Sequence, residues 1–275
     1  MRLKWLGMLG ILLVLAIVPA LAQVASTPSS TETTDVIASR QFHPMKFHKV
    51  RSDGTVESTN WSGYAVTGSS FTVAKGSWTV PAVNCSQTPN TYAAFWVGID
   101  GYNSDSVEQT GTLAECNGTS ALYYAWYEFY PNPSYEITSV PVSPGNQISA
   151  SVTYSGSEFT TTITNESTGK SYSKTARVRG AARSSAEWIA EAPCCTSSGG
   201  ILPLADFGTA DFGQDYTDVS GTNDATDSST SGVISAFGSN VQDIIMINGS
   251  TDADEAVPSG LSSDGTSFTV TWDSE

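Results

Sequence analysis

The sequence predicts an all-β fold, a sandwich of two antiparallel sheets of the jelly-roll or lectin-like kind. Three observations predict it. Short stretches of alternating apolar and polar residues recur from about residue 71 to the C-terminus, with Gly, Pro, Asn and Ser between them. No stretch keeps a convincing 3.6-residue period, which an amphipathic helix requires. The length from Gly54 onward, about 220 residues, is enough for one large β domain with its own core.

The N-terminus predicts a secretory signal peptide over residues 1–22. Arg2 and Lys4 give a positive start, residues 6–18 are apolar, and a small-x-small cleavage site ends at Ala22. A membrane anchor is the alternative, but the apolar run is short for spanning a bilayer. No later segment is apolar over the length needed. We therefore expect a secreted, extracellular protein without membrane contact after signal cleavage.

Residues 23–53 differ in composition from everything that follows. They begin with a Ser/Thr/Pro tract, which lacks the apolar surface to fold alone. They end with a basic cluster that includes His43 and His48. We expect a largely disordered pro-segment, with a flexible N-terminal linker as the alternative. The folded domain then spans residues 54–275.

The expected strands follow one another at short spacing. Pro81 and Pro131 end two of them, because proline cannot donate a ladder hydrogen bond. One strand is almost continuously apolar and another strongly aromatic, while those from about 147 to 178 alternate as a meander. In chain order the expected strands are 71–73, 77–80, 92–99, 107–115, 121–130, 147–154, 158–164, 171–178, 186–193, 204–212, 232–237, 243–247 and 267–272.

The expected strand at 186–193 places two acids on one face. Trp188 points to one side, and Glu187, Ile189 and Glu191 point to the other, because side chains alternate along a strand. An acid in this position is either an exposed surface charge, which is the usual case, or a placed acid/base.

The domain is strongly acidic. From Gly54 onward, six Lys and Arg residues stand against 24 Asp and Glu residues, a formal net charge of −18. This excludes nucleic acid as a partner, because phosphates need cationic contacts. It also indicates work at low pH, where a protein with few bases does not become strongly positive. Solubility of a secreted protein is the alternative explanation.

Both histidines precede the domain. A Ser-His-Asp triad, a Cys-His pair and zinc held by His are therefore excluded from it, and an enzyme here must use Asp or Glu as its acid/base. We expect no cofactor and no metal. Four cysteines in an exported chain indicate disulfides, and spacing leaves three pairings open. They are Cys85, Cys116, Cys194 and Cys195.

Four further stretches contain residues that are costly to place in a strand, namely aromatic residues, acids or a mid-strand Gln. Taken singly, each aromatic residue favours the core, and an aromatic face with an acid could equally be a sugar-binding groove. The last stretch alternates so that Tyr124, Trp126, Glu128 and Tyr130 share one face. The four stretches are 60–64, 95–101, 108–111 and 124–131.

Together these stretches resemble the glutamic peptidases, also called eqolisins. The matching strings, in order, are SGYAV after NW, FWVGIDG, EQTG, YYAWYEFYP, AEWIAEAP and ADFG, from about Val56 to near the C-terminus. The resemblance implies a secreted β-sandwich endopeptidase, made as a proenzyme and active at acid pH. It would act on proteins or peptides, as a monomer, without inhibition by pepstatin.

The resemblance also implies the site. The Gln of the QTG string is Gln109, and the Glu that closes the EWIxE string is Glu191; these two would form the catalytic dyad. Glu187 lies on the same expected face and is the rival base, and the family match rather than spacing favours Glu191. The implied substrate-binding residues are Trp61, Trp96, Asp100, Trp126, Glu128 and Tyr130.

The sequence departs from the family pattern at three places. Tyr124 and Leu113 stand where fungal members have acids, and Ala192 to Cys194 stand where those members usually read Asp-Phe-Glu. These departures concern subsite preference, the pH optimum and the hydrogen bonds that support Glu191.

The dyad is chemically sufficient for peptide hydrolysis. The Glu191 carboxylate would take a proton from the attacking water and pass it to the leaving amine, while the Gln109 amide holds the oxyanion. Two alternatives use the same residues. One is a secreted carbohydrate-binding sandwich, and the other is a glycoside hydrolase with Glu128 and Glu191 as its two carboxylates.

Charge predicts how the expected pro-segment acts. Its basic strip, with His43 and His48, is expected to lie on the acidic domain near neutral pH. Protonation of the cleft carboxylates on acidification would weaken that attraction and allow self-cleavage between about His48 and Glu57.

Overall fold

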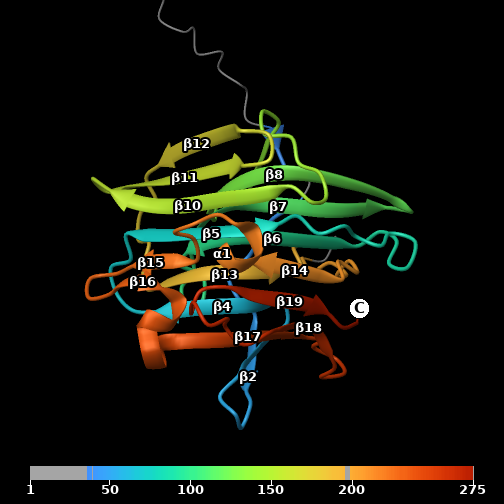
Figure 1. The fold of residues 1–275 in the computed structure, drawn as a ribbon. Helices are drawn as coiled ribbons and strands as arrows, with labels where there is room; N and C mark the ends of the chain where they lie inside the picture. The colour runs from blue at the N-terminus through green and yellow to red at the C-terminus, as the bar shows by residue number, and fades with distance from the viewer. Residues whose placement is uncertain (1–35, 39, 196–198, 275) are drawn as a thin grey trace, which may run out of the picture. The chain divides into compact units, whose positions relative to one another are not determined.

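The computed structural model describes residues 36–38, 40–195 and 199–274 (Figure 1). The expected signal peptide and residues 23–35 of the expected pro-segment lie outside the described residues. The elements, in chain order, are β1 (Val36–Ile37), β2 (Phe47–Val50), β3 (Val56–Ser58), β4 (Trp61–Thr67), β5 (Val73–Thr79), β6 (Tyr92–Ile99), β7 (Val107–Asn117), β8 (Ser120–Tyr130), β9 (Tyr135–Ile137), β10 (Gln147–Ser155), β11 (Glu158–Asn165), β12 (Lys170–Ala176), β13 (Ser185–Glu191), β14 (Thr209–Phe212), α1 (Gln214–Thr217), β15 (Asp224–Thr226), β16 (Ser231–Val233), the 3₁₀ helix η1 (Ile234–Asn240), β17 (Val241–Ile247), β18 (Asp254–Pro258) and β19 (Phe268–Trp272).

Two antiparallel layers confirm the predicted all-β sandwich. In one layer, hydrogen-bonded neighbours run β9-β8-β7-β6-β13-β4-β17. In the other they run β12-β11-β10-β5, and β5 also pairs with β14 and β15 (Figure 1). Strands β18 and β19 connect β17 to β14, so the two layers join along one side. The pairing of β3 with β17 is parallel.

The main hydrophobic core lies between the layers. It includes Trp188 and Phe95 from the first layer and Trp78 and Phe212 from the second, all at most 1% exposed. A second apolar cluster forms on the opposite face of the first layer, around Trp96. The first layer therefore carries apolar side chains on both faces. Strands that are covered on both faces are expected to be apolar on both. The described part of the chain contains no helix long and apolar enough to cross a membrane.

The cysteine pairing is one of the three that the sequence left open. Cys85 is bonded to Cys116, and Cys194 is bonded to its neighbour Cys195. The first bond joins the loop after β5 to the end of β7. The second follows β13 directly and lies at the end of the predicted catalytic strand.

The segment before the domain is paired to both sides of the first layer. Strand β1 adds to β9 at one edge, and β2 pairs with β3, which lies beside β17 at the other edge. The residues between β1 and β2 must therefore cross the intervening strands. We call Arg40–Lys46 the strap. Residues 36–38 and 40–53 of the expected pro-segment thus contain β1, the strap and β2, and both β1 and β2 gain ladder hydrogen bonds.

Candidate active site

The site is built on one face of five adjacent strands. Residues paired across antiparallel strands point to the same side of a sheet. The register pairs Glu187 with Gly98, Gly98 with Gln109, and Gln109 with Glu128, so these form one row across β13, β6, β7 and β8. The next row along these strands contains Ile189, Trp96, Gly111 and Trp126, and Glu191 pairs with Trp61 of β4. The face opposite the main core thus carries nearly every residue that the sequence implicated.

A glycine gives this face its shape. Gly98 leaves room for the Trp96 ring, since a Cβ at Gly98 would lie 2.8 Å from Trp96 Cζ3. The Trp96 ring also meets Trp61 edge to face, with centroids 4.9 Å apart. Close packing around Gly98 therefore fixes the indole that contacts the predicted base.

Glu191 is completely buried and hydrogen-bonded by groups from three parts of the chain. Trp96 Nε1 donates to its Oε2 at 2.8 Å, and the backbone N–H of His43 donates to its Oε1 at 3.1 Å. Asn60 Nδ2 lies 3.5 Å from the same Oε1. Burial raises the pKa of Glu191 to about 8, although the hydrogen bonds from His43, Trp96, Asn60 and Trp61 act in the opposite direction.

Gln109 lies beside a second buried acid. Its Nε2 donates to Glu128 Oε2 at 2.8 Å, and its Oε1 has no hydrogen-bond partner among the described residues. Glu128 also accepts a hydrogen bond from the backbone N–H of Phe42. Burial, and then the charge of Glu191, raise the pKa of Glu128 well above its usual range. Glu128 and Glu191 are therefore close enough to interact, and the strand that carries Gln109, β7, lies between their strands in the sheet.

The strap lies along this face and contacts the predicted site directly. Phe42 is fully buried and stacks on Trp126, with ring centroids 3.6 Å apart and an interplanar angle of 13°. Trp61 Nε1 donates to the His43 carbonyl at 3.1 Å, and the His43 ring lies 5.2 Å from that of Tyr130. Successive backbone N–H groups, of Phe42 and His43, thus reach Glu128 and Glu191 respectively.

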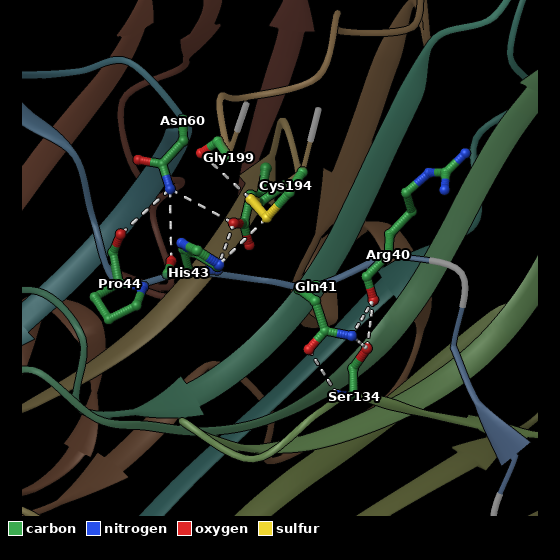
Figure 2. The surroundings of a disulfide bond; sticks show 10 residues. Arg40, Gln41, His43, Pro44, Asn60, Ser134, Cys194 and Gly199 are labelled. Atoms are coloured by element: carbon green, nitrogen blue, oxygen red, sulfur yellow. Dashed lines mark hydrogen bonds between the residues drawn. A yellow bond between two sulfur atoms is a disulfide. The ribbon is translucent and has the colours of Figure 1, made fainter. Parts of the chain in front are cut away.

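Asn60 and the end of β13 hold the strap on its other side. The Asn60 amide nitrogen lies 3.4–3.5 Å from the carbonyl oxygens of His43 and Pro44 (Figure 2). Its Oδ1 accepts the backbone N–H of Lys46 at 2.6 Å. Gln41 and Cys194 exchange two backbone hydrogen bonds, of 3.0 and 2.8 Å, in an antiparallel bridge. The strap is therefore bound chiefly through its backbone.

Five of the six predicted substrate-binding residues surround the strap, and Asp100 does not. Asp100 is fully buried, and its carboxylate oxygens accept the backbone N–H groups of Arg183 at 2.6 Å and Ser184 at 2.8 Å. These bonds anchor the chain just before β13, and a role of Asp100 in binding substrate stays a prediction. The five that contact the strap or line its path are Trp61, Trp96, Trp126, Glu128 and Tyr130.

The rival acid Glu187 lies on the same face but has different surroundings. It is fully buried, and burial raises its pKa well above the usual range. Neither of its carboxylate oxygens receives the indole and backbone donors that Glu191 has. Of the two readings that residue type left open for these acids, an exposed surface charge does not apply, because both side chains are fully buried.

Sequence patterns missed two contributors to the site. Asn60 directly precedes Trp61 in a matched string, and a buried Asn next to an aromatic residue is a usable signal because its amide needs partners. Phe42 is a single apolar residue in a polar stretch, and nothing local marks it as buried.

One group of side chains in the described part of the chain has metal-ligand character. His43, Cys194 and Cys195 have potential ligand atoms within 4.8 Å of one another. The two sulfur atoms are joined in a disulfide (Figure 2), whereas metal binding requires thiolates. The carboxyl and amide groups around Glu191 therefore remain the candidates for chemistry.

A β-sandwich with a buried Gln and a buried Glu on the face of one layer that points away from the main core matches a known class of peptidase. The model of the peptidase A4 family matches residues 59–259, and the chain belongs to this family. It is 32% identical over 178 residues to aspergillopepsin-2 of Aspergillus niger, covering 56% of this chain and 62% of the relative. It is 33% identical over 178 residues to scytalidopepsin B of Scytalidium lignicola, covering 62% and 66%. The matches thus span less than two thirds of each of these relatives.

A solved structure agrees. The chain is similar to scytalido-glutamic peptidase, crystallised with a transition-state analogue inhibitor, with a TM-score of 0.65 and 27% identity. The match covers 78% of this chain and 98% of that one. The resemblance inferred from short strings is therefore confirmed, together with the fold that it implied.

Proposed function

We propose that the protein is a secreted acid endopeptidase that hydrolyses peptide bonds in proteins with the Gln109 and Glu191 dyad. One observation carries the proposal. A stretch of peptide backbone, Phe42–His43, lies across the predicted dyad with its N–H on Glu191 and the preceding N–H on Glu128. A face that binds an extended backbone beside a buried amide and two carboxyl groups has the parts that peptide hydrolysis requires.

The residues would act in a fixed order. Glu191 as carboxylate takes a proton from water while the water oxygen bonds to the scissile carbonyl carbon. The Gln109 NH₂ group stabilises the developing oxyanion, and Glu128 orients that amide. The carbon–nitrogen bond then breaks as Glu191 donates its proton to the leaving nitrogen. The products are a carboxylic acid and an amine, and one water is consumed.

The raised pKa of Glu191 fits the second step. A carboxyl group with a pKa near 8 readily holds the proton that the leaving amine must receive. Departure of the strap would let water reach Glu191, lower its pKa and make the carboxylate available for the first step. The acidic pH optimum would then be set by the pKa that Glu191 has in the cleft without the strap, and not by its pKa in the strapped form.

The strap would keep the enzyme latent. The His43 N–H donates a hydrogen bond to Glu191 Oε1, an oxygen that would otherwise accept one from the attacking water. Exposed residues Ser52 to Gly54 form the turn between β2 and β3, within the range where self-cleavage was expected. We propose that a cut near this turn frees the strap. The predicted signal peptide and the Cys85–Cys116 disulfide support export, and we propose a monomer.

Cleavage of a denatured protein at about pH 3–4, near the ordinary Glu pKa, tests this function. Pepstatin is present throughout, and the wild type is compared with Glu191→Gln and Gln109→Ala. We expect activity only in the wild type, with losses of at least about 10²-fold in each variant. Circular dichroism and intact disulfides establish that the variants are folded. Full activity in either folded variant contradicts the dyad.

A further inference from the structure

We propose that Asn60 binds the main chain of a substrate beyond the cleaved bond, with Ser58 as the positioning residue that orients the Asn60 amide. The preferred substrate is then an extended polypeptide that continues for at least four residues past that bond. This role depends on the proposed peptidase function, because the strap is taken as the peptide that shows where a substrate lies.

The strap gives the register of a peptide in the cleft. The His43 N–H donates to Glu191 Oε1 at 3.1 Å, so the peptide bond on the predicted base is Phe42–His43. Lys46 is the fourth residue after that bond, and β2 begins at the next residue. The strap main chain from His43 to Lys46 therefore stands for the part of a substrate that follows the cut.

Asn60 lies between β3 and β4, beside the predicted base. It is 1% exposed, and its carbonyl accepts the backbone N–H of Ala192 at 2.9 Å. Its side-chain nitrogen lies 3.5 Å from Glu191 Oε1. A polar group held in this way by two neighbouring strands is preorganised, so a ligand binds it at little cost in side-chain freedom.

The Ser58 hydroxyl determines which way the Asn60 amide points. It is fully buried and accepts the backbone N–H groups of Asn60 and Trp61, at 3.3 and 3.1 Å. A hydroxyl has one proton to donate, and here it goes to Asn60 Oδ1 at 3.0 Å. The amide oxygen is therefore fixed toward Ser58, and the NH₂ group faces Glu191 and the strap.

The strap main chain is bound at this junction from both of its polar groups. Asn60 Nδ2 lies 3.4 Å from the Pro44 carbonyl oxygen (Figure 2), and Asn60 Oδ1 accepts the Lys46 N–H at 2.6 Å. The backbone N–H of Thr59 donates to the Lys46 carbonyl at 2.9 Å. We call Thr59 N–H and the Asn60 side chain the main-chain clamp. Such contacts give affinity for a peptide whatever its side chains.

The clamp should therefore favour long chains. A peptide without an N–H at the fourth residue after the cut would leave Asn60 Oδ1, a buried acceptor, with one partner fewer. The loss of such a hydrogen bond corresponds to about tenfold in kcat/KM.

The test uses the full chain after acid processing and the peptide Ala-Gln-Phe-Ala-Ala-Ala-Ala-Ala. One comparison peptide is N-methylated at the fourth residue after Phe, and another ends as a dimethylamide after the third. We expect kcat/KM of the parent peptide to exceed that of both by about tenfold, with every cut directly after Phe by mass spectrometry. N-methylation at the fifth residue is the matched control and should change little.

Three results would overturn the clamp. The first is equal kcat/KM for the parent peptide and the peptide methylated at the fourth residue. The second is an equal loss from methylation at the fifth residue. The third is a cut at another bond, which would refute the register.

Variants assign the effect to its residues. Asn60→Ala should lower kcat/KM for every peptide, because it also removes a contact with Glu191, and it should abolish the tenfold ratio between parent and methylated peptides. Ser58→Ala frees the amide to rotate and should reduce that ratio to about threefold. The matched Ser62→Ala removes another buried hydroxyl, which donates to the Ala256 carbonyl, and should leave the ratio unchanged. An unchanged ratio in folded Asn60→Ala contradicts the assignment.

Binding separates failure of the clamp from failure of the peptidase. The Glu191→Gln chain carries a recognition site for an added protease in the exposed turn at Ser52 to Gly54, and gel filtration removes the freed strap. Tryptophan fluorescence then measures the affinity of the same peptides. Tighter binding of the parent than of the methylated peptide, without cleavage by the wild type, would retain the clamp and refute the peptidase. Cleavage by the wild type with equal binding of the two peptides would refute the clamp alone.

Discussion

The strap provides a measurable prediction because one of its side chains, that of Phe42, is fully buried in the cleft. Phe42 is fully buried, whereas Phe47, five residues later in the same segment, is 60% exposed. Truncating a buried Phe to Ala typically costs 3–5 kcal/mol, and truncating an exposed one costs little. The Phe42→Ala change should therefore destabilise the closed strap by about 3 kcal/mol or more, and Phe47→Ala should not.

A loss of this size has a kinetic consequence. Each 1.4 kcal/mol is a tenfold change in an equilibrium constant, so the open fraction of the uncleaved chain should rise by about 10²-fold. Since only the open chain offers Glu191 to a substrate, activity before processing should rise in proportion until opening is complete. Phe47→Ala serves as the matched control of residue type and segment.

The assay measures initial rates of the intact chain on a quenched fluorescent peptide at about pH 6, above the ordinary Glu pKa, where acid processing is slow. Gel electrophoresis of the same samples shows whether the chain is still uncleaved. We expect the Phe42→Ala rate to exceed the wild-type and Phe47→Ala rates by about two orders of magnitude. The reasoning is refuted if the three intact chains have equal rates yet reach equal activity after processing.

Two further predictions concern Glu191. Trp96→Phe removes the indole donor at 2.8 Å from Glu191 and retains an aromatic ring, so the pKa of Glu191 should rise and kcat/KM should fall by about tenfold or more. Trp78→Phe is the control, because it also loses a buried indole hydrogen bond, to Thr112 on the other face of the sheet. It should leave the pH profile of kcat/KM unchanged. Because the folded-state pKa of about 8 lies above the ordinary value of 4.5, the stabilising contribution of protonated Glu191 is complete below pH 4.5 and is lost as pH rises to about 8. In the inactive Gln109→Ala background, the loss of stability with rising pH, measured by urea unfolding over this window, should be about 1.4 kcal/mol per pH unit steeper than in the chain that also carries Glu191→Gln, where the other buried acids still contribute. Equal slopes in the two chains would contradict the assignment.

Strand positions were predictable where apolar residues formed a continuous run or alternated clearly with polar ones. The expected strand 92–99 coincides with β6, and those at 107–115 and 121–130 are the greater parts of β7 and β8. The expected strand 232–237 is instead a short strand followed by η1. Ile234 and Phe237 are three residues apart and both buried, which matches the period of a 3₁₀ helix and resembles alternation only over a short window.

The composition of the site was predictable, and its geometry was not. Alternation placed Glu187 and Glu191 on one face, yet it could not separate them, because their difference lies in donors from other strands and from the strap. The position of Asp100 shows the converse. It follows an apolar strand as the pattern requires, but a φ of 72° ends the alternation there, and its carboxylate meets the backbone at residues 183 and 184 instead of the cleft. Non-local hydrogen bonds decide the role of each acid, and a sequence pattern carries no information about them.

Carboxyl groups hold the segment before the domain at two places, with Glu191 bound to the strap and Asp252 paired with residues of β2. In the cleft, burial raises the pKa of Glu191, while the His43 N–H of the strap acts to lower it. At the periphery, Lys49 and His48 pair with Asp252 at 2.8 and 3.3 Å. The hydrogen bond from Lys49 lowers the pKa of Asp252, so this pair favours closure above that pKa and is lost only as the pH falls below about 3.8. Acid would therefore weaken the hold on this segment through its peripheral ion pairs, and a cut in the exposed turn at Ser52 to Gly54 is what would make an opening permanent.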